Sequence, residues 1–167
     1  LKDIPPKDVI KMVAGFGLNI KSIHDAGGTV DKNHPSSINP VLYNYLELMT
    51  CNDFIIVLHS PHTKTKLGES WWKDHQLGYV KELKSLSENY NLLIENICEF
   101  EGYYVSLVKP EDLYDFCTNN NLCINIDTSH YAEGKIDIIE AAKFLKNTKA
   151  VHLSDCTKDA RHVYVGE

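Results

Sequence analysis

Short apolar runs in this chain end, one after another, in side chains of the types that bind metal ions. His24, His59, Glu95, Asp127 and His152 each follow such a run, at intervals of 35, 36, 32 and 25 residues. Each interval is long enough for a loop, a helix and the return to the next parallel strand. Because the carboxyl ends of parallel strands meet at one face of an α/β barrel or open sheet, the five side chains are expected to converge. The pattern predicts an α/β fold with a site for several metal ions, or for one metal ion joined to a substrate.

The composition is that of a single domain covering residues 1–167. A chain of 167 residues with 43% hydrophobic content can bury a sizeable core. No secretory segment and no apolar stretch of about 18 residues is present, so neither export nor a membrane partner is expected. The cysteines form no C-x-x-C pair, which predicts reduced, partly buried thiols and a cytoplasmic location. They are Cys51, Cys98, Cys117, Cys123 and Cys156.

The net charge argues against a protein whose main task is to grip nucleic acid. The chain carries a formal net charge of −6 and has a pI of about 5.7, whereas proteins that bind the phosphate backbone show a basic face. Lys64, Lys66 and Lys73 could form a local basic patch, although a solvated helix start is the more ordinary interpretation. A small molecule is therefore the more expected partner, and nucleic acid the less expected one.

Helical and extended patterns alternate along the chain. Pro5-Pro6 opens a helix that Gly17 ends, and no hairpin signature breaks the βα order, so a parallel sheet is expected. Five strands are fewer than the eight of a closed barrel, which needs at least about 200 residues, so the chain is expected to cover about five βα units and to be incomplete at both ends. The expected helices are 6–16, 39–50, 70–88, 110–119 and 136–146, and the expected strands are 18–24, 53–59, 91–96, 122–127 and 149–153.

The helix expected over 70–88 carries apolar residues at helical spacing. Leu77, Val80, Leu83 and Leu86 are expected to form its buried stripe. The pair Trp71-Trp72 near its start could wall a sugar or stack on a base, or one tryptophan could pack the helix onto the sheet.

Asp127-Thr128-Ser129-His130 is the sharpest local motif. A carboxylate at a strand end and an imidazole about one helical turn later can hold a metal ion, or a metal ion and a substrate hydroxyl. The alternative is that Asp127 caps the next turn and His130 lies at the surface. Because other candidate ligands also stand at strand ends, the metal site is the favoured interpretation.

Glu95 and His152 also end buried runs. A carboxylate there is costly unless it is paired or binds a cation, so a metal site is expected at Glu95, with a salt bridge to a lysine as the alternative. His152 is a ligand candidate that Asp155 could support, or else a structural buried histidine.

The remaining histidines are assigned by position alone. His24 and His59 are candidate ligands because each ends a strand, and His62 lies close enough to His59 to compete with it. His162 is a candidate in a loop, with a solvated side chain as the alternative. Those expected at the surface are His34 and His75.

Four stretches of the chain resemble the xylose-isomerase-like TIM-barrel superfamily, which contains sugar-phosphate isomerases and epimerases and endonuclease IV (AP endonuclease family 2). The resemblance covers nearly the whole chain. It implies a (β/α)8 TIM barrel of which this chain lacks the first two strands and the last one. The stretches are 92–96 (LLIEN), 126–130 (IDTSH), 151–155 (VHLSD) and 161–167 (RHVYVGE).

The resemblance implies roles for particular residues. Glu95, Asp127 and His152 would be ligands of the metal site shared across the superfamily, with a fourth ligand beyond Glu167. In the sugar-acting members, His130 would touch substrate.

The endonuclease IV pattern would add further metals. His24 and His59 would join Glu95 on one ion, and His130 with His162 would hold another. That last site expects Asp two residues before its His, where this chain has Ala160, with Asp159 one place off. The loop from 25 to 37 also lacks the aromatic side chain that inserts into DNA in the endonuclease.

Two enzyme functions and one binding function fit these residues. The first is a divalent-metal-dependent isomerase or epimerase of a small sugar or sugar phosphate, in which Glu95 or a missing counterpart on the last strand moves the proton next to a metal-polarised carbonyl, with His130 at the substrate. The second is an endonuclease IV-like zinc phosphodiesterase acting on abasic DNA. The third is a degenerate barrel that binds a ligand or partner without turnover.

The sequence favours the isomerase. The acidic surface and the missing Asp at position 160 support it, whereas retention of His24, His59 and His162 supports the phosphodiesterase. Zn²⁺ is the expected metal, with Mn²⁺, Co²⁺ or Mg²⁺ as alternatives. The sugar, the number of metal ions and the oligomeric state stay open.

Overall fold

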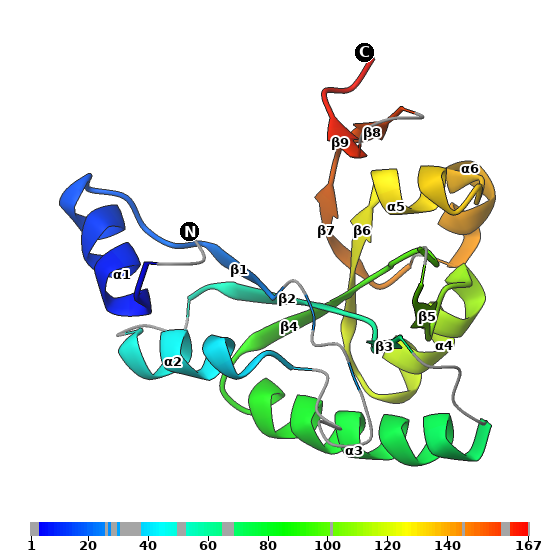
Figure 1. Cartoon of the computed structure of the whole chain (residues 1–167), viewed down its shortest axis with the longest axis horizontal. Helices are drawn as coiled ribbons and strands as arrows, with labels where there is room; N and C mark the ends of the chain where they lie inside the picture. Colours follow the sequence, from blue (N-terminus) through cyan, green and yellow to red (C-terminus); the bar gives the residue numbers. More distant parts are fainter. Residues whose placement is uncertain are drawn as a thin grey trace.

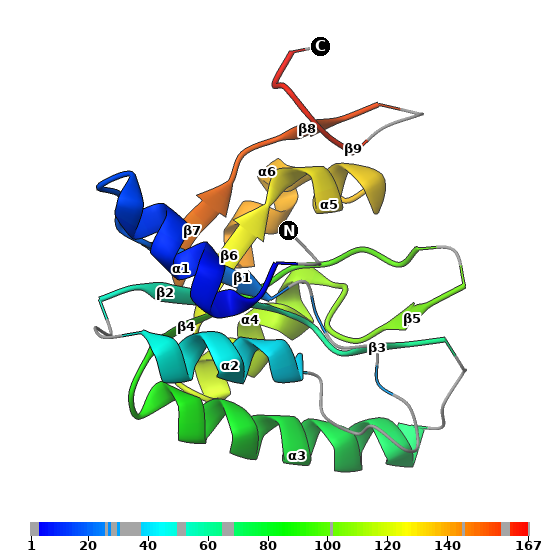
Figure 2. The same cartoon turned by 60° about the vertical axis from the view of Figure 1, so that its left-hand side comes forward.

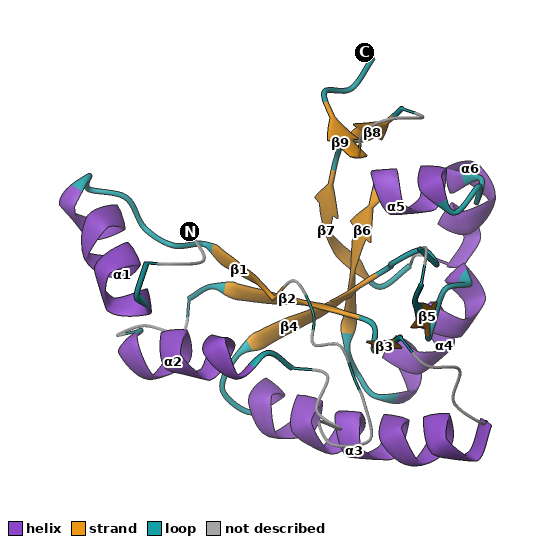
Figure 3. Ribbon diagram, viewed as in Figure 1, coloured by secondary structure: helices purple, strands orange, loops and turns teal. Residues whose placement is uncertain are grey.

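The computed structural model of the chain is a parallel sheet with helices packed against it (Figures 1 and 3). It describes residues 4–25, 27, 30, 38–49, 53–64, 69–100, 102–144, 146–157 and 161–166. The helices are α1 (Pro6–Gly15), α2 (Pro40–Leu48), α3 (Glu69–Ser87), α4 (Pro110–Asn119), α5 (Thr128–Glu133) and α6 (Ile138–Ala141), the last continued by a 3-10 turn, Ala142–Phe144. The strands of the main sheet are β1 (Ser22–Asp25), β2 (Ile55–His59), β4 (Asn91–Glu95), β6 (Cys123–Asp127) and β7 (Thr148–His152).

The strands of the main sheet lie in the order in which the chain makes them, β1-β2-β4-β6-β7, and all neighbours are parallel. A doubly wound sheet would reverse its order at a switch point, whereas a sheet that grows in one direction keeps its crossover helices on one face. Helices α2 and α3 lie along the same face in both views (Figures 1 and 2). The expectation of an α/β fold with five parallel strands is confirmed.

Helix starts follow local signals that the sequence displays. Proline occupies the first helical position of α1, α2 and α4, where its missing N–H leaves no hydrogen bond unmade. Asn39 caps α2 by accepting from the N–H of Val41 at 3.0 Å, and Asp137 caps α6 in the same way. At the end of α1, Gly17 takes a φ of +69°, which agrees with the predicted stop.

The strands bury one face of the sheet against helices and carry the candidate ligands on the other face. Ile56, Ile94 and Ile124 have no exposed surface and pack with apolar side chains of α2, α3 and α4. Because successive strand residues point to opposite faces, the odd-numbered residues of β2, β4 and β6 face away from those helices. His59, Glu95 and Asp127 are odd-numbered, so they project from the other face at the carboxyl ends of their strands.

One prediction about the chain order was wrong. Hairpin-like pairing exists: β8 (Asp155–Cys156) pairs antiparallel with β9 (Arg161–Val163), and β3 (His62–Thr63) pairs antiparallel with β5 (Tyr104–Val105). These strands are only two or three residues long, too short to display an alternating pattern in sequence. Residues 128–133 form helix α5, which was not among the expected helices and which Asp127 caps.

The buried stripe of α3 differs from the predicted one. Leu83 and Leu86 are buried, but Leu77 is 64% exposed. Tyr79 and His75 are buried instead, four and eight residues before Leu83, in line with the helical repeat. The expectation that His75 lies at the surface is therefore wrong, and His34 lies outside the described residues.

The cysteines that the structure describes are free thiols. Cys98 and Cys117 are buried, Cys123 and Cys156 are half-buried, and no disulfide joins these four; Cys51 lies outside the described residues. Within the described ranges, none of the helices combines the length and apolar character needed to cross a bilayer.

Leu83 and Leu77 provide a matched test of the core. Leu83→Ala should lower the free energy of unfolding by about 2–5 kcal/mol, because it deletes a fully packed side chain. Leu77→Ala, the same substitution on the same helix, should change it by less than about 0.5 kcal/mol. Urea unfolding followed by circular dichroism measures both, and equal losses would contradict the assignment of the α3 face.

Candidate metal centre

Five strands and the β8–β9 hairpin bring seven candidate ligands into one cluster. β1, β2, β4, β6 and β7 each contribute the side chain at or next to their carboxyl end, α5 contributes His130, and β9 contributes His162. All the ligands expected from the sequence therefore meet, namely His24, His59, Glu95, Asp127, His130, His152 and His162.

A β-bulge is needed to bring His152 into this cluster. The register between β6 and β7 shifts after Ile124, so that Asp127 stands opposite His152. Without the shift, Asp127 would face Val151, and His152 would point to the opposite side of the sheet. The bulge therefore decides which side chain of β7 reaches the site.

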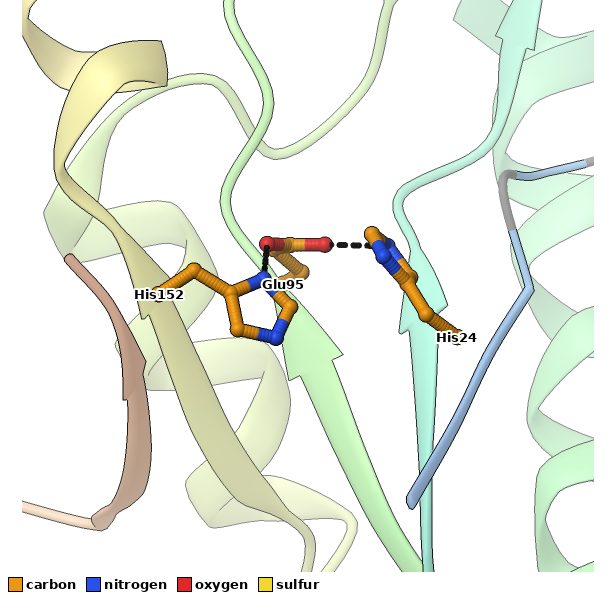
Figure 4. A group of neighbouring side chains, drawn as sticks. All are labelled: His24, Glu95 and His152. Carbon is orange, nitrogen blue, oxygen red and sulfur yellow. Dashed lines mark hydrogen bonds and ion pairs between the residues drawn. The ribbon is translucent and has the colours of Figure 1, made fainter. Parts of the chain in front are cut away.

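Glu95 lies at the centre of the cluster and is completely buried. Its Oε2 atom lies 2.7 Å from His24 Nε2 and 2.9 Å from His59 Nε2, while its Oε1 atom lies 2.7 Å from His152 Nδ1. Figure 4 shows the carboxylate between His24 on one side and His152 on the other. Each oxygen thus faces its own set of histidine nitrogens.

The contacts of Glu95 Oε2 are too many for hydrogen bonds alone. His24 Nε2 and His59 Nε2 also lie 2.8 Å from each other, so three polar atoms form a closed triangle. Each ring nitrogen carries at most one hydrogen, and an ionised carboxylate carries none. At most two of the three contacts can be hydrogen bonds, and the third opposes two donors or two acceptors. A cation shared by the three lone pairs would satisfy all of them.

Asp127 divides its two oxygens in the same manner. Oδ1 accepts from the backbone N–H groups of Ser129 and His130 at 2.8 and 3.2 Å, and from the Ser129 hydroxyl at 2.7 Å. Oδ2 lies 3.6 Å from His162 Nδ1 and 3.8 Å from His152 Nδ1. The two interpretations of Asp127, helix cap and ligand candidate, therefore belong to different atoms of one side chain.

His130 is held in one tautomer. Its Nδ1 lies 2.7 Å from the carbonyl oxygen of Asn96, which can only accept, so Nδ1 carries the proton. Burial lowers the pKa of His130, although Asp127 and the Asn96 carbonyl oppose that effect. The neutral ring then keeps a lone pair on Nε2, which is the state of a metal ligand.

His162 completes a second group with Asp127 and His130. One potential ligand atom from each of the three lies within 4.8 Å of the other two, and the same holds for His24, Glu95 and His152. His162 has a left-handed backbone with φ of +53°, an uncommon conformation for a residue with a side chain. Its Nδ1 lies 3.3 Å from the Ser129 hydroxyl and 3.2 Å from that of Ser154.

Two buried carboxylate oxygens mark where cations fit. Glu95 Oε2 and Asp127 Oδ2 accept no well-directed hydrogen bond from the described residues, although both are buried. A buried charged oxygen without a well-directed hydrogen bond lowers the stability of the fold unless a cation compensates its charge. Both atoms face histidine nitrogens, so the donor set of neutral imidazoles and carboxylates suits a divalent transition metal.

Several supporting side chains were not predicted as site residues. Asn96 accepts from the Asp127 N–H at 2.7 Å and donates to its carbonyl at 3.0 Å. The Tyr79 hydroxyl donates to the His59 carbonyl at 3.2 Å. Asn125 donates to Glu95 at 3.0 Å. Of these three side chains, only Asn96 had a signal in the sequence, because it directly follows Glu95. The roles of Tyr79 and Asn125 depend on contacts with residues far away in sequence.

His62, the expected competitor of His59, lies outside the two groups. It is buried in β3, with ring centroids 5.6 Å from Phe100 and 5.5 Å from Tyr103. Gly27 separates it from His59: with φ of +82°, a Cβ at Gly27 would come within 3.1 Å of both histidines. This close approach requires glycine. Ala160 and Asp159 lie outside the described residues.

Neither comparison with known proteins finds a relative: no protein-family model matches the chain, and no curated protein matches it in sequence. The chemistry of the site therefore rests on its own residues.

The pKa values of Glu95 and His24 are coupled through their contact. Burial by itself raises the pKa of Glu95, but the short contacts with His24 and His59 and their charge outweigh it and hold this pKa well below its usual range. The hydrogen bond to Glu95 raises the pKa of His24 against the opposing effect of burial. In the metal-free protein, Glu95 contributes stability above the ordinary carboxyl range, which is lost as the pH falls through its lowered pKa. His24 contributes stability that is complete below its unfolded pKa of 6.5 and is lost as the pH rises through its raised pKa.

In the presence of a chelator, wild type should therefore exceed His24→Gln in melting temperature by more at about pH 5.5 than at about pH 8.5. His75→Gln should show the opposite trend, because burial lowers the pKa of His75. Adding Zn²⁺ should reverse the trend for His24, because a metal ion binds only the deprotonated ring. Thermal melts across this pH range measure all three effects, and a difference independent of pH would contradict the Glu95–His24 coupling.

Proposed function

We propose that the protein is a divalent-metal-dependent phosphodiesterase of the endonuclease IV type, built on a (β/α)8 barrel of the xylose-isomerase-like superfamily. The single observation that carries the proposal is the division of the Glu95 carboxylate. Oε2 contacts His24 and His59, and Oε1 contacts His152. A carboxylate whose two oxygens face different sets of histidines suits a site with at least two metal ions. Such sites are typical of enzymes that hydrolyse phosphate esters.

The same contacts weigh against the sugar isomerase that the sequence favoured. One metal ion on Glu95, Asp127 and His152 would leave His24 and His59 with no task, yet their Nε2 atoms lie within 2.9 Å of Glu95 Oε2. The isomerase keeps one supporting observation, the proximity of Glu95, Asp127 and His152 beside the buried His130. It therefore remains the second candidate.

Zn²⁺ is the proposed metal, because neutral imidazole and carboxylate are its usual ligands. When bound, divalent ions would activate a water molecule and offset the charge that develops on the phosphate. Glu95 and Asp127 would hold the ions from below, since both are buried. His24, His152 and His162 lie at the open side of the cluster, with side chains 39%, 35% and 52% exposed.

The acidic net charge does not conflict with a phosphodiester substrate. Each divalent ion adds two positive charges at the site itself, where bound cations are often the largest local charges. Substrate binding would therefore depend on the metal more than on a basic surface.

Metal analysis and a cleavage assay test the proposal together. The protein loaded with Zn²⁺ should retain two or more ions per chain and should cleave a DNA duplex at a single abasic-site analogue. Hydrolysis breaks one phosphodiester P–O bond and leaves a phosphate monoester and a free hydroxyl, so gel electrophoresis with end-labelled strands identifies the products. One ion per chain, no cleavage, and conversion of ketoses or their phosphates would instead establish the isomerase.

His59→Ala separates the two candidates at one residue. For the phosphodiesterase, it should remove one metal ion per chain and lower cleavage by more than about 100-fold, beyond the loss typical of residues that only support a ligand. The isomerase predicts an unchanged metal content. His75→Ala provides the control, because His75 is also a buried histidine but lies on α3, outside the cluster.

A further inference from the structure

Asn125 lies in the row of side chains directly beneath the cluster. It is completely buried on β6, opposite Glu95 of β4 and Ala150 of β7. Its Nδ2 donates to Glu95 Oε1 at 3.0 Å and lies 3.2 Å from His152 Nδ1. Asn125 therefore contacts two of the proposed ligands from a position that no solvent reaches.

The orientation of the Asn125 amide is fixed by chemistry. Glu95 Oε1 can only accept when ionised, so the NH₂ group and not the carbonyl must face it. The amide carbonyl then points away, and Asn125 Oδ1 is buried with no hydrogen-bond partner among the described residues. An NH₂ group has no lone pair for a metal ion, so Asn125 acts on the cluster through the groups it contacts.

The contact anchors one oxygen of Glu95 and so fixes the orientation of the carboxylate. Oε1 receives the amide of Asn125, whereas Oε2 accepts no well-directed hydrogen bond and faces His24 and His59. A carboxylate that lost this anchor could rotate about its last side-chain bond, since that torsion is broad. Both oxygens could then turn toward the same group of histidines.

We propose that Asn125 is a positioning residue that holds the Glu95 carboxylate with Oε2 toward His24 and His59 and Oε1 toward His152, so that each oxygen would be able to take a metal ion of its own. The inference rests on the proposed function, because only a site with two or more ions needs a divided carboxylate. It assigns Asn125 no contact with substrate or metal. The buried amide with an unmade hydrogen bond on its other side is costly, which a purely structural position would avoid with an apolar residue.

Asn125→Leu removes the donor while keeping a side chain of similar size, and Asn125→Ala removes the donor without adding bulk. Cys123→Ala is the matched control, because Cys123 lies on the same face of β6 two residues earlier. We expect both Asn125 variants to bind the second Zn²⁺ at least about tenfold more weakly than wild type, as for other partners of a metal ligand. We expect Cys123→Ala to bind both ions normally.

Zinc titration against a chromophoric chelator measures the two affinities on the full chain. The visible spectrum of the Co²⁺-loaded protein provides a second measurement, because it reports coordination geometry and should change in both Asn125 variants but not in the control. Circular dichroism of the metal-free proteins shows that each variant is folded, and Asn125→Ala replaces Asn125→Leu if the larger side chain prevents folding.

The outcomes separate this inference from the proposed function. Two ions in wild type, with the second weakened in the Asn125 variants, support both. Two ions in wild type and equal affinities and Co²⁺ spectra in the variants overturn the role of Asn125 and leave the phosphodiesterase standing. One ion or none in wild type overturns the phosphodiesterase, and the divided carboxylate with it.

Discussion

The burial of the Glu95 carboxylate among histidines is the constraint on which this site depends. A negative charge with no access to solvent requires compensation, and His24, His59 and His152 provide it from three different strands. Those contacts need β1, β2 and β7 on either side of β4 and β6, in register, so the sheet and the cluster specify each other. Asp127 repeats the arrangement one strand further along, with one oxygen anchored by the protein and the other turned toward histidines.

The sequence predicted the parts of the fold that local signals encode. Pro5-Pro6 and Gly17 located the first helix, and apolar runs ending in candidate ligands located the five parallel strands to within a few residues, whereas helix α5 was not expected. Convergence of the ligands followed from one topological rule, because parallel strands share their carboxyl ends. The candidate ligands and their positions at the strand ends could therefore be predicted from the sequence.

The features that escaped prediction depend on pairing between distant segments. The bulge that turns His152 toward Asp127 arises from a one-residue shift between β6 and β7, and no residue type marks it. Asn125 and Tyr79 appear unremarkable in sequence, since their partners lie 30 and 20 residues away. His75 and Leu77 exchanged their expected environments because the direction of the buried face of α3 is set by the sheet beneath it.

The spacing of the ligands has a consequence for how the chain behaves without metal. An ion held by His24, Glu95 and His152 would join residues that lie 71 and 57 positions apart in sequence. It would act as a set of crosslinks, because closing such loops costs entropy. The proposed ion would thus contribute to the stability of the folded chain as well as to its chemistry.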